Sequence, residues 1–319
     1  MENKRCKCLA SSRKWANMNY DILVKIFMML STMDLVSSIS LVCPSWRVEC
    51  CHPMLCHTPD LARLNYSVDN PRDLFASLDN WPRLSLAQAL DSALILSGTN
   101  VMRLIFHLHA HITDERLIFA AERCPRLKRL VLPAWNHISA NGFCAAIQKL
   151  KELRSLTLPC NYFPTKILQT IGINCPKLTK LKVMCPFDHD FANTLFIYFP
   201  NLKALSVRCT IVHKDALRLT LMLFDDLDVL NITHSLLMDF NPSEGPTIFK
   251  CESDKSIAEQ ASKLKAIFWR QTESCIMCQR VHNDLGRPKW NEYEEGLGEK
   301  TRKVLLQFDQ VCCDHVCDV

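Results

Sequence analysis

The sequence is poor in glycine, with seven glycines among 319 residues. This scarcity argues against folds built on glycine-rich phosphate-binding loops, and no Gly-x-Gly-x-x-Gly, Walker or Gly-x-Ser-x-Gly motif is present. No run approaches the ~18 consecutive apolar residues that a membrane-spanning helix needs. The first fifteen residues lack the apolar stretch of a secretory signal peptide. The sequence therefore favours a protein of the cytoplasm or nucleus, or both, that does not enter a membrane.

Cysteine is more frequent, with 18 residues, but this is below the ~8–10% that marks a small disulfide-bonded scaffold. Without a secretory signal, we expect these thiols to be reduced. The composition is 48% hydrophobic and 22% charged, which is typical of a globular chain. The net charge of +5 is mild, and no dense basic stripe with interleaved aromatic residues occurs. We therefore predict no nucleic-acid partner.

A Leu-x-x-Leu-x-apolar motif recurs along the middle of the chain. Five copies begin at Leu127, Leu153, Leu178, Leu202 and Leu227, and a degenerate copy begins at Val101, so that successive starts lie 24 to 26 residues apart. The Leu-x-apolar half alternates with period two, as in a short strand with one buried face, and a helical pattern follows each strand. One strand and one helix in ~25 residues is the unit of a leucine-rich repeat. We therefore predict an α/β solenoid with a curved parallel sheet and outer helices.

The residues between the repeat leucines are expected on the inner, concave side of the sheet. Five basic residues occur along these strands: Arg103, Arg129, Lys180, Lys182 and Arg208. Such a face can simply be solvated, or it can bind an acidic segment of a partner, because solenoids bind ligands on their concave side. Both interpretations remain open, and under the second one these five are the predicted substrate-binding residues.

Residues 15–57 do not follow the repeat. Apolar residues at helical spacing predict one helix at about 20–30, and Thr32 can cap a second helix that contains Leu35. Pro44 stands where a third short helix can start. Three short helices form only a small core that is marginal on its own. We therefore expect this block to dock either on the repeats or on another chain.

This block also resembles an F-box. The resemblance is carried by Asp21-Ile22-Leu23-x-x-Ile26-Phe27-x-x-Leu30, by Val42-Cys43-x-x-Trp46-Arg47 and by Pro53-Met54-Leu55. The Cys-Pro-x-Leu openings of the repeats are similar to the cysteine-containing leucine-rich repeats that follow F-boxes. Over roughly residues 15–240, the chain resembles plant F-box/leucine-rich-repeat proteins.

The resemblance implies a non-catalytic substrate receptor of a Skp–cullin–F-box (SCF) ubiquitin ligase, without a cofactor. Its F-box would dock on a Skp-family adaptor and through it on a cullin, and its repeats would hold the protein to be ubiquitinated. The adaptor-facing positions of the family correspond to Met18, Asn19, Ile22, Leu23, Ile26, Leu35, Val42, Cys43 and Trp46.

One departure from the family keeps an alternative open. The usual Leu-Pro is Met18-Asn19 here, and the loss of proline removes a constraint on the turn before the helix. The chain could then be a repeat scaffold whose degenerate F-box no longer binds the adaptor. A nucleic-acid-binding or metal-binding protein that uses the cysteine-rich tail is a third alternative.

The sequence suggests five segments. Residues 1–14 form a basic flexible tail, 15–57 an F-box-like helical domain, 58–100 a linker and N-terminal cap, 101–239 about six repeats, and 240–319 a cap helix and a cysteine-containing tail that is partly disordered. The cap helix is predicted at about 254–269, and residues 240–319 match no repeat.

The cysteines of that last segment allow two interpretations. Cys275, Cys278 and His282 could share a zinc ion with the later group Cys312, Cys313, His315 and Cys317. They could equally be free thiols. The second group lacks regular spacing and lies more than thirty residues away, so we predict no metal site.

Overall fold

The computed structural model describes residues 18–30, 34–35, 38–56, 91–95, 100–106, 112–132, 138–158, 164–241, 245–269 and 276–283. The predicted basic tail, most of the predicted linker and residues 284–319 lie outside this range. Within it, no helix combines the length and the apolar character needed to cross a bilayer. The chain divides into two compact units, Met1–His111 and Ile112–Val319.

The first unit is built from short helices. Its elements are α2 (Tyr20–Phe27), η1 (Ile39–Leu41), α4 (Pro44–Cys50), α5 (Pro53–Cys56) and β1 (Arg103–Ile105), and residues 91–95 are also helical. Pro44 opens α4, as predicted, and the Cys43 Sγ accepts a hydrogen bond from the Trp46 N–H at 3.5 Å. The first helix ends at Phe27, earlier than the periodicity suggested.

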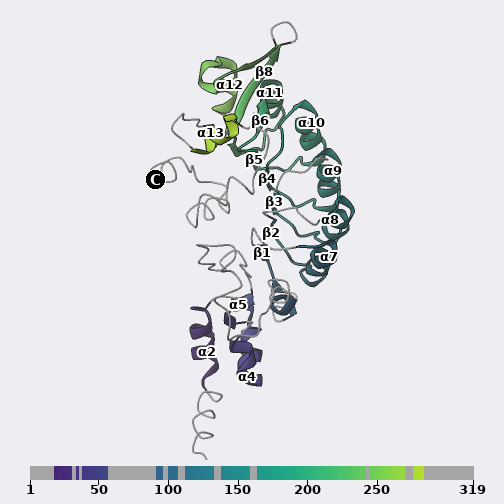
Figure 1. The fold of residues 1–319 in the computed structure, drawn as a ribbon, viewed down its shortest axis with the longest axis vertical. Helices are drawn as coiled ribbons and strands as arrows, with labels where there is room; N and C mark the ends of the chain where they lie inside the picture. The colour runs from purple at the N-terminus through teal and green to yellow at the C-terminus, as the bar shows by residue number, and fades with distance from the viewer. Residues whose placement is uncertain are drawn as a thin grey trace, which may run out of the picture. The chain divides into compact units, whose positions relative to one another are not determined.

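The second unit alternates helices and strands (Figure 1). Its repeats comprise α7 (Asp114–Arg123), β2 (Arg129–Val131), α8 (Ala140–Ile147), β3 (Ser155–Leu158), α9 (Pro164–Asn174), β4 (Lys180–Val183), α10 (His189–Tyr198), β5 (Ala204–Ser206), β6 (Ile211–His213), α11 (Lys214–Leu223) and β7 (Val229–Asn231). It continues with β8 (Leu236–Asn241), β9 (Gly245–Ile248), η4 (Cys251–Ser253), α12 (Lys255–Ala261), β10 (Ala266–Phe268) and α13 (Ile276–Asn283).

The strands of this unit form the predicted parallel sheet, in the order β2–β3–β4–β5–β7–β10. The register aligns equivalent repeat positions, so that Leu156, Leu181, Leu205 and Leu230 lie in one row across neighbouring strands. Each of these leucines is at most 1% exposed. Their burial explains the repeat, because every unit contributes apolar side chains to one continuous core. The leucine-rich-repeat prediction is thereby confirmed, as are its helices.

The C-terminal part of the array differs from the prediction. The expected helix at about 254–269 is wrong in length, because α12 ends at Ala261 and residues 266–268 form strand β10. Strand β10 pairs in parallel with β7 and extends the sheet, so residues 240–319 do contain a further repeat strand. A second sheet, in the order β6–β8–β9, also went unpredicted. Its hairpin separates β7 from β10 in sequence and thereby masks the repeat spacing.

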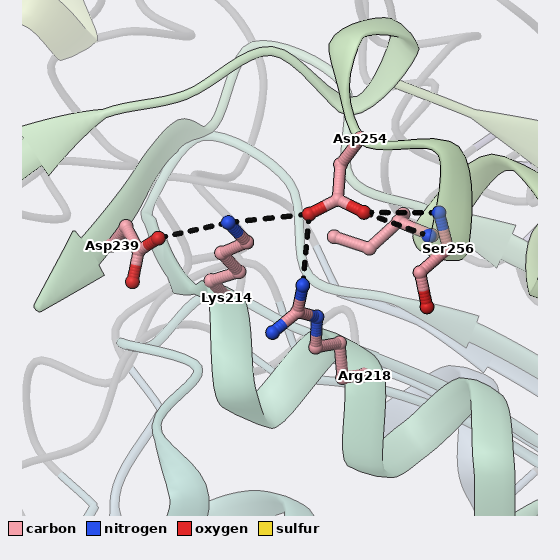
Figure 2. A network of polar contacts seen from close by, with 6 residues as sticks. Lys214, Arg218, Asp239, Asp254 and Ser256 are labelled. Atoms are coloured by element: carbon pink, nitrogen blue, oxygen red, sulfur yellow. Dashed lines mark hydrogen bonds and ion pairs between the residues drawn. The ribbon is translucent and has the colours of Figure 1, made fainter.

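An ionic network fastens α12 to the last repeat helix (Figure 2). The Lys214 Nζ lies 2.8 Å from the Asp239 Oδ2 and 3.2 Å from the Asp254 Oδ2, and the Arg218 Nη2 lies 3.0 Å from that same oxygen. The other oxygen of Asp254 caps α12 by accepting from the N–H groups of Ser256 and Ile257. One carboxylate therefore both starts α12 and pairs with two cations of α11.

Candidate protein-binding surfaces

The helices of the first unit enclose a small apolar core. Leu23, Phe27, Leu35 and Cys50 are its buried members. Trp46 packs against this core, with its ring edge to face with Phe27 at a centroid distance of 5.5 Å. This cluster fixes α2 against α4, and it leaves the other side of α2 without a role in the core.

That other side of α2 is apolar and exposed. Ile22 is 52% exposed and Ile26 is 41% exposed, and side chains four positions apart lie on one face of a helix. Residues 20–54 hold nine exposed large hydrophobic side chains, against seven in the rest of the described chain: Tyr20, Ile22, Ile26, Met28, Met29, Leu41, Val42, Val48 and Met54. So dense a group of exposed apolar side chains is typical of a protein-binding surface.

The structure divides the nine predicted adaptor-facing residues into three groups. Asn19, Ile22, Ile26 and Val42 are exposed; Met18, Cys43 and Trp46 are half-buried; and Leu23 and Leu35 are buried. Leu23 and Leu35 therefore belong to the unit's own core, and adaptor binding by the nine residues stays a prediction. Met29 and Leu41, which the resemblance did not include, are 86% and 65% exposed and belong to the same apolar surface. The spacing of Met29, seven residues after Ile22, was the signal that could have identified it.

The second candidate surface is the face of the repeat sheet that points away from the leucine row. Successive side chains of a strand point to opposite faces. Strand register therefore places Thr157, Lys182, Ser206 and Asn231 in one row on this face. We refer to these four residues as the inner row.

The predicted substrate-binding residues differ widely in exposure. Arg103, on β1 of the first unit, is exposed, as is Lys180 on β4, and Arg129 on β2 is half-buried. Lys182 and Arg208 are only 2% and 6% exposed. The predicted basic face is therefore only partly exposed, and substrate binding by these five residues stays a prediction. The sequence also gave no weight to Thr157 and Ser206, whose hydroxyls are buried without a hydrogen-bond partner among the described residues.

Two of the described thiols are buried between repeats. Burial raises the pKa of Cys124 to about 12 and that of Cys175 to about 12, which makes both poor nucleophiles. Each closes a repeat helix, and the Cys175 Sγ lies 3.4 Å from the Leu150 carbonyl oxygen of the preceding repeat. Within the described part of the chain, no group of three or more His, Cys, Asp or Glu side chains could hold a metal ion.

Of the cysteines considered for zinc, only Cys278 is described, and its Sγ lies 3.2 Å from the Nδ1 of His234. Cys275, Cys312, Cys313 and Cys317 lie outside the described residues. The prediction of no metal site is therefore untested.

Comparison with known proteins identifies the first unit. The F-box domain family model matches residues 15–58. Over 287 residues the chain is 39% identical to the F-box/LRR-repeat protein At3g48880 of Arabidopsis thaliana, a match that covers 89% of this chain and 93% of the relative. The chain belongs to the F-box/LRR-repeat family. At family level, this F-box/LRR-repeat protein is a substrate receptor of the SCF type.

Two more distant likenesses accompany this one. F-box protein SKIP1 of Arabidopsis thaliana is 25% identical over 170 residues, which is 53% of this chain and 54% of the relative. Among solved structures, the leucine-rich repeat-containing protein LegL7 of Legionella pneumophila has a TM-score of 0.33 at 10% identity, covering 56% of this chain and 68% of the other. The repeat fold of the F-box/LRR-repeat protein therefore rests on its own strand order and register.

Proposed function

We propose that this chain is the substrate-recognition subunit of an SCF-type ubiquitin ligase. Its F-box docks on a Skp-family adaptor, which links it to a cullin, and its repeats hold the protein to be ubiquitinated. The single observation that carries the adaptor half is the exposed apolar surface of residues 20–54, which coincides with the F-box match. Apolar side chains such as Ile22 and Ile26 have no role in the core, but they gain free energy when a partner covers them.

The substrate half of the proposal is less specific. Arg129 and Lys180 give the reachable part of the inner sheet surface of the second unit a positive charge, which suits an acidic segment of a protein substrate. Arg103, the other exposed member of the predicted set, lies in the first unit. Lys182 and Arg208 belong to the same set, and they require uncovering before a substrate can reach them. The chain needs no cofactor, nucleic acid or membrane for this role, and its compartment under this proposal is the cytoplasm or the nucleus.

The alternative of a degenerate F-box depends on Asn19. The backbone of Asn19 has φ −56° and ψ 134°, and its side chain accepts a hydrogen bond from the Asp21 N–H at 2.8 Å. Proline fixes φ near −65°, so asparagine holds this turn in a proline-like conformation and caps the helix as well. This geometry favours the substrate-receptor proposal over the alternative in which a degenerate F-box no longer binds the adaptor.

The test is a pull-down of a purified Skp-family adaptor by the full chain and by the Ile22→Asp/Ile26→Asp variant. Each isoleucine that a partner buries contributes ~1.5–3 kcal/mol, so the double variant should weaken binding by about 100-fold or more. The matched control is Ile173→Asp/Ile197→Asp, because these isoleucines are 63% and 65% exposed on repeat helices. This control should bind like the wild type.

A second arm replaces the degenerate turn. We expect Asn19→Pro to bind the adaptor to within about fivefold of the wild type, because proline is compatible with the φ of this residue but gives up a side-chain cap worth ~1 kcal/mol. If neither the wild type nor Asn19→Pro captures the adaptor, the receptor proposal fails and the scaffold alternative takes its place.

A further inference from the structure

Three neighbouring repeat helices carry an exposed apolar residue at the same repeat position. Ile173 on α9, Ile197 on α10 and Met222 on α11 each stand five residues before the leucine that leads into the next strand. Their side chains are 63%, 65% and 61% exposed. We refer to these three residues as the outer row. The repeats themselves gain little from apolar side chains here, because most of each side chain stays in water.

Polar residues bound the outer row on both sides. The same repeat position holds Glu122 on α7, Gln148 on α8 and Glu259 on α12, and all three are exposed. Helices α9, α10 and α11 pack one beside the next, and α9 and α10 lie on the outer side of the curved sheet (Figure 1). An exposed apolar centre with a polar rim is the composition of a protein-binding surface.

The charges beside the outer row have opposite signs at its two ends. Seven residues before each row member, and therefore on the same helix face, stand Lys166 on α9, Asp190 on α10 and Asp215 on α11. All three are exposed. The α9 end of this face is therefore positive, and its α11 end is negative.

The turns that follow these helices repeat the contrast. After α9 comes Lys177, whose side chain is still 51% exposed although its Nζ lies 2.6 Å from the Glu152 Oε1. After α11 comes Asp225, which is exposed. The face thus has a charge pattern that reverses from one end to the other about an apolar middle.

Such a face is complementary to itself about a two-fold axis that runs parallel to α10. That axis lays α9 of one copy on α11 of the second copy, and each α10 on the other α10. Ile173 then meets Met222 of the second copy, and Lys166 faces Asp215 of the second copy. Each of these contacts occurs twice, whereas the repulsion between the two Asp190 carboxylates at the axis occurs once. An axis along the row would instead place each charged residue against the apolar residue of the same helix.

The area of this face sets the strength of the association. Helices of 10 or 11 residues are about 15 Å long, and three of them side by side are about 30 Å wide. Two such faces cover about 900 Å² in total, which is below the roughly 1,200–2,000 Å² of a stable interface. The face therefore suits a weak dimer, with a Kd in the micromolar range.

We propose that the full chain forms a weak two-fold dimer through the outer row, with α9 of one copy on α11 of the second copy. This inference goes beyond the proposed function and does not depend on it, because no residue of the F-box takes part.

Sedimentation velocity of the full chain between roughly 1 and 200 µM measures the Kd of this dimer. The wild type should change from monomer to dimer within that range. Ile197→Asp should raise the Kd by at least about 100-fold, because it places two carboxylates in the apolar centre. The matched control is Ile248→Asp, which changes an isoleucine that is 57% exposed on β9, outside the row. This control should dimerise like the wild type.

Charge exchange tests the orientation of the two copies. Lys166→Asp and Asp215→Lys should each raise the Kd about tenfold, because each replaces two attractive pairs by two repulsive ones. The variant that combines both changes has opposite charges in every pair again, and its Kd should return to within about threefold of the wild type. Asp190→Asn removes the like-charge contact at the axis, and it should lower the Kd about threefold. Tighter association cannot result from loss of the fold.

Three results would overturn the inference. They are a wild type that stays monomeric up to about 200 µM, equal effects of Ile197→Asp and Ile248→Asp, and a combined charge exchange that associates no better than the single changes. None of them involves the adaptor, so failure of the adaptor pull-down is recognised separately. Each copy keeps its own F-box, and the Ile173→Asp/Ile197→Asp variant, although monomeric, should still capture the adaptor.

Discussion

At the start of α2, Asn19 combines a backbone conformation that proline would also adopt with a side chain that caps the helix. Its amide oxygen accepts from the Asp21 N–H, and its backbone already has a proline-like φ. A missing N-terminal cap costs about 1 kcal/mol of helix stability. We expect Asn19→Ala to loosen α2 by that amount, whereas Asn19→Asp, which keeps an acceptor, should not. Hydrogen exchange of the first α2 amides measures this difference, and equal protection in the alanine variant and the wild type would contradict the role of the cap.

Helix propensity and side-chain packing predict opposite effects of the Gly142→Ala substitution on the stability of the repeats. Alanine is favoured over glycine within a helix by up to ~1 kcal/mol. A Cβ at Gly142 in α8, however, would lie 2.0 Å from the Cγ of Asp114. That carboxylate is held in place because it accepts from the Ser139 N–H at 2.7 Å and from the Ser139 hydroxyl at 2.6 Å. We therefore expect Gly142→Ala to destabilise the repeats by about 1–3 kcal/mol.

Urea unfolding measures this effect, with Asn141→Ala as the control, because Asn141 is exposed on the same helix turn. In the double variant Asp114→Ala/Gly142→Ala the clash is absent, so the two changes should cost less together than the sum of their separate effects. If Gly142→Ala alone stabilised the repeats, the Asp114 carboxylate would not lie as close to position 142 as described.

Residue-level exposure was the least predictable property of this chain. The alternation of strand residues places Lys182 on the inner face correctly, but it cannot indicate that this side chain is only 2% exposed. Similarly, helical spacing groups Leu23 with Ile22 and Ile26 without revealing that Leu23 faces the core. Period and propensity are local properties, whereas burial depends on segments distant in the sequence.

At the scale of elements, the regular repeats were predictable and the last one was not. The five repeat helices follow from leucine positions that recur at nearly constant spacing. Strand β10 escaped prediction because the β8–β9 hairpin and α12 separate it from β7. A repeat search depends on spacing, and an inserted hairpin changes the spacing without changing the stacking of strands.

The junction between α11 and α12 leads to a pH prediction. The pKa of Asp254 is lowered, chiefly because the Ile257 N–H donates to it and then because Lys214 and Arg218 lie beside it. A carboxyl with a depressed pKa stabilises the fold above its ordinary pKa near 4, and this stability is lost as the pH falls through the folded value. The pKa of Lys214 is raised, chiefly by its hydrogen bond to Asp239. Lys214 therefore contributes its full stabilisation of the fold below pH ~10.4, and this stabilisation is lost as the pH rises through its folded pKa.

Asp254→Asn isolates the ionic part of this junction, because asparagine still caps a helix. We expect the free energy of unfolding of the variant to be lower than that of the wild type by about 1 kcal/mol at pH 7, as for a partly exposed ion-pair network. This difference should shrink as the pH falls below about 4. Urea unfolding at several pH values measures the difference. Asp226→Asn, at an exposed position outside this network, serves as the control. A difference between Asp254→Asn and the wild type that persists at low pH would rule out the ionic explanation.

At the scale of the whole molecule, the F-box is the part that gains most from a partner. Among its described residues the core has four buried members, and so small a core supplies little stability of its own. A partner that binds only the folded form, present at 100 times its Kd, stabilises that form by ~2.7 kcal/mol. We therefore expect a purified Skp-family adaptor to slow hydrogen exchange in α2 and α4 of the full chain, and to leave α8–α10 of the repeats unchanged. The Ile22→Asp/Ile26→Asp variant should lose this protection, and Ile173→Asp/Ile197→Asp should retain it. Protection that appears equally in α8–α10, or that survives the α2 variant, would mean that the adaptor binds somewhere other than the apolar surface of residues 20–54.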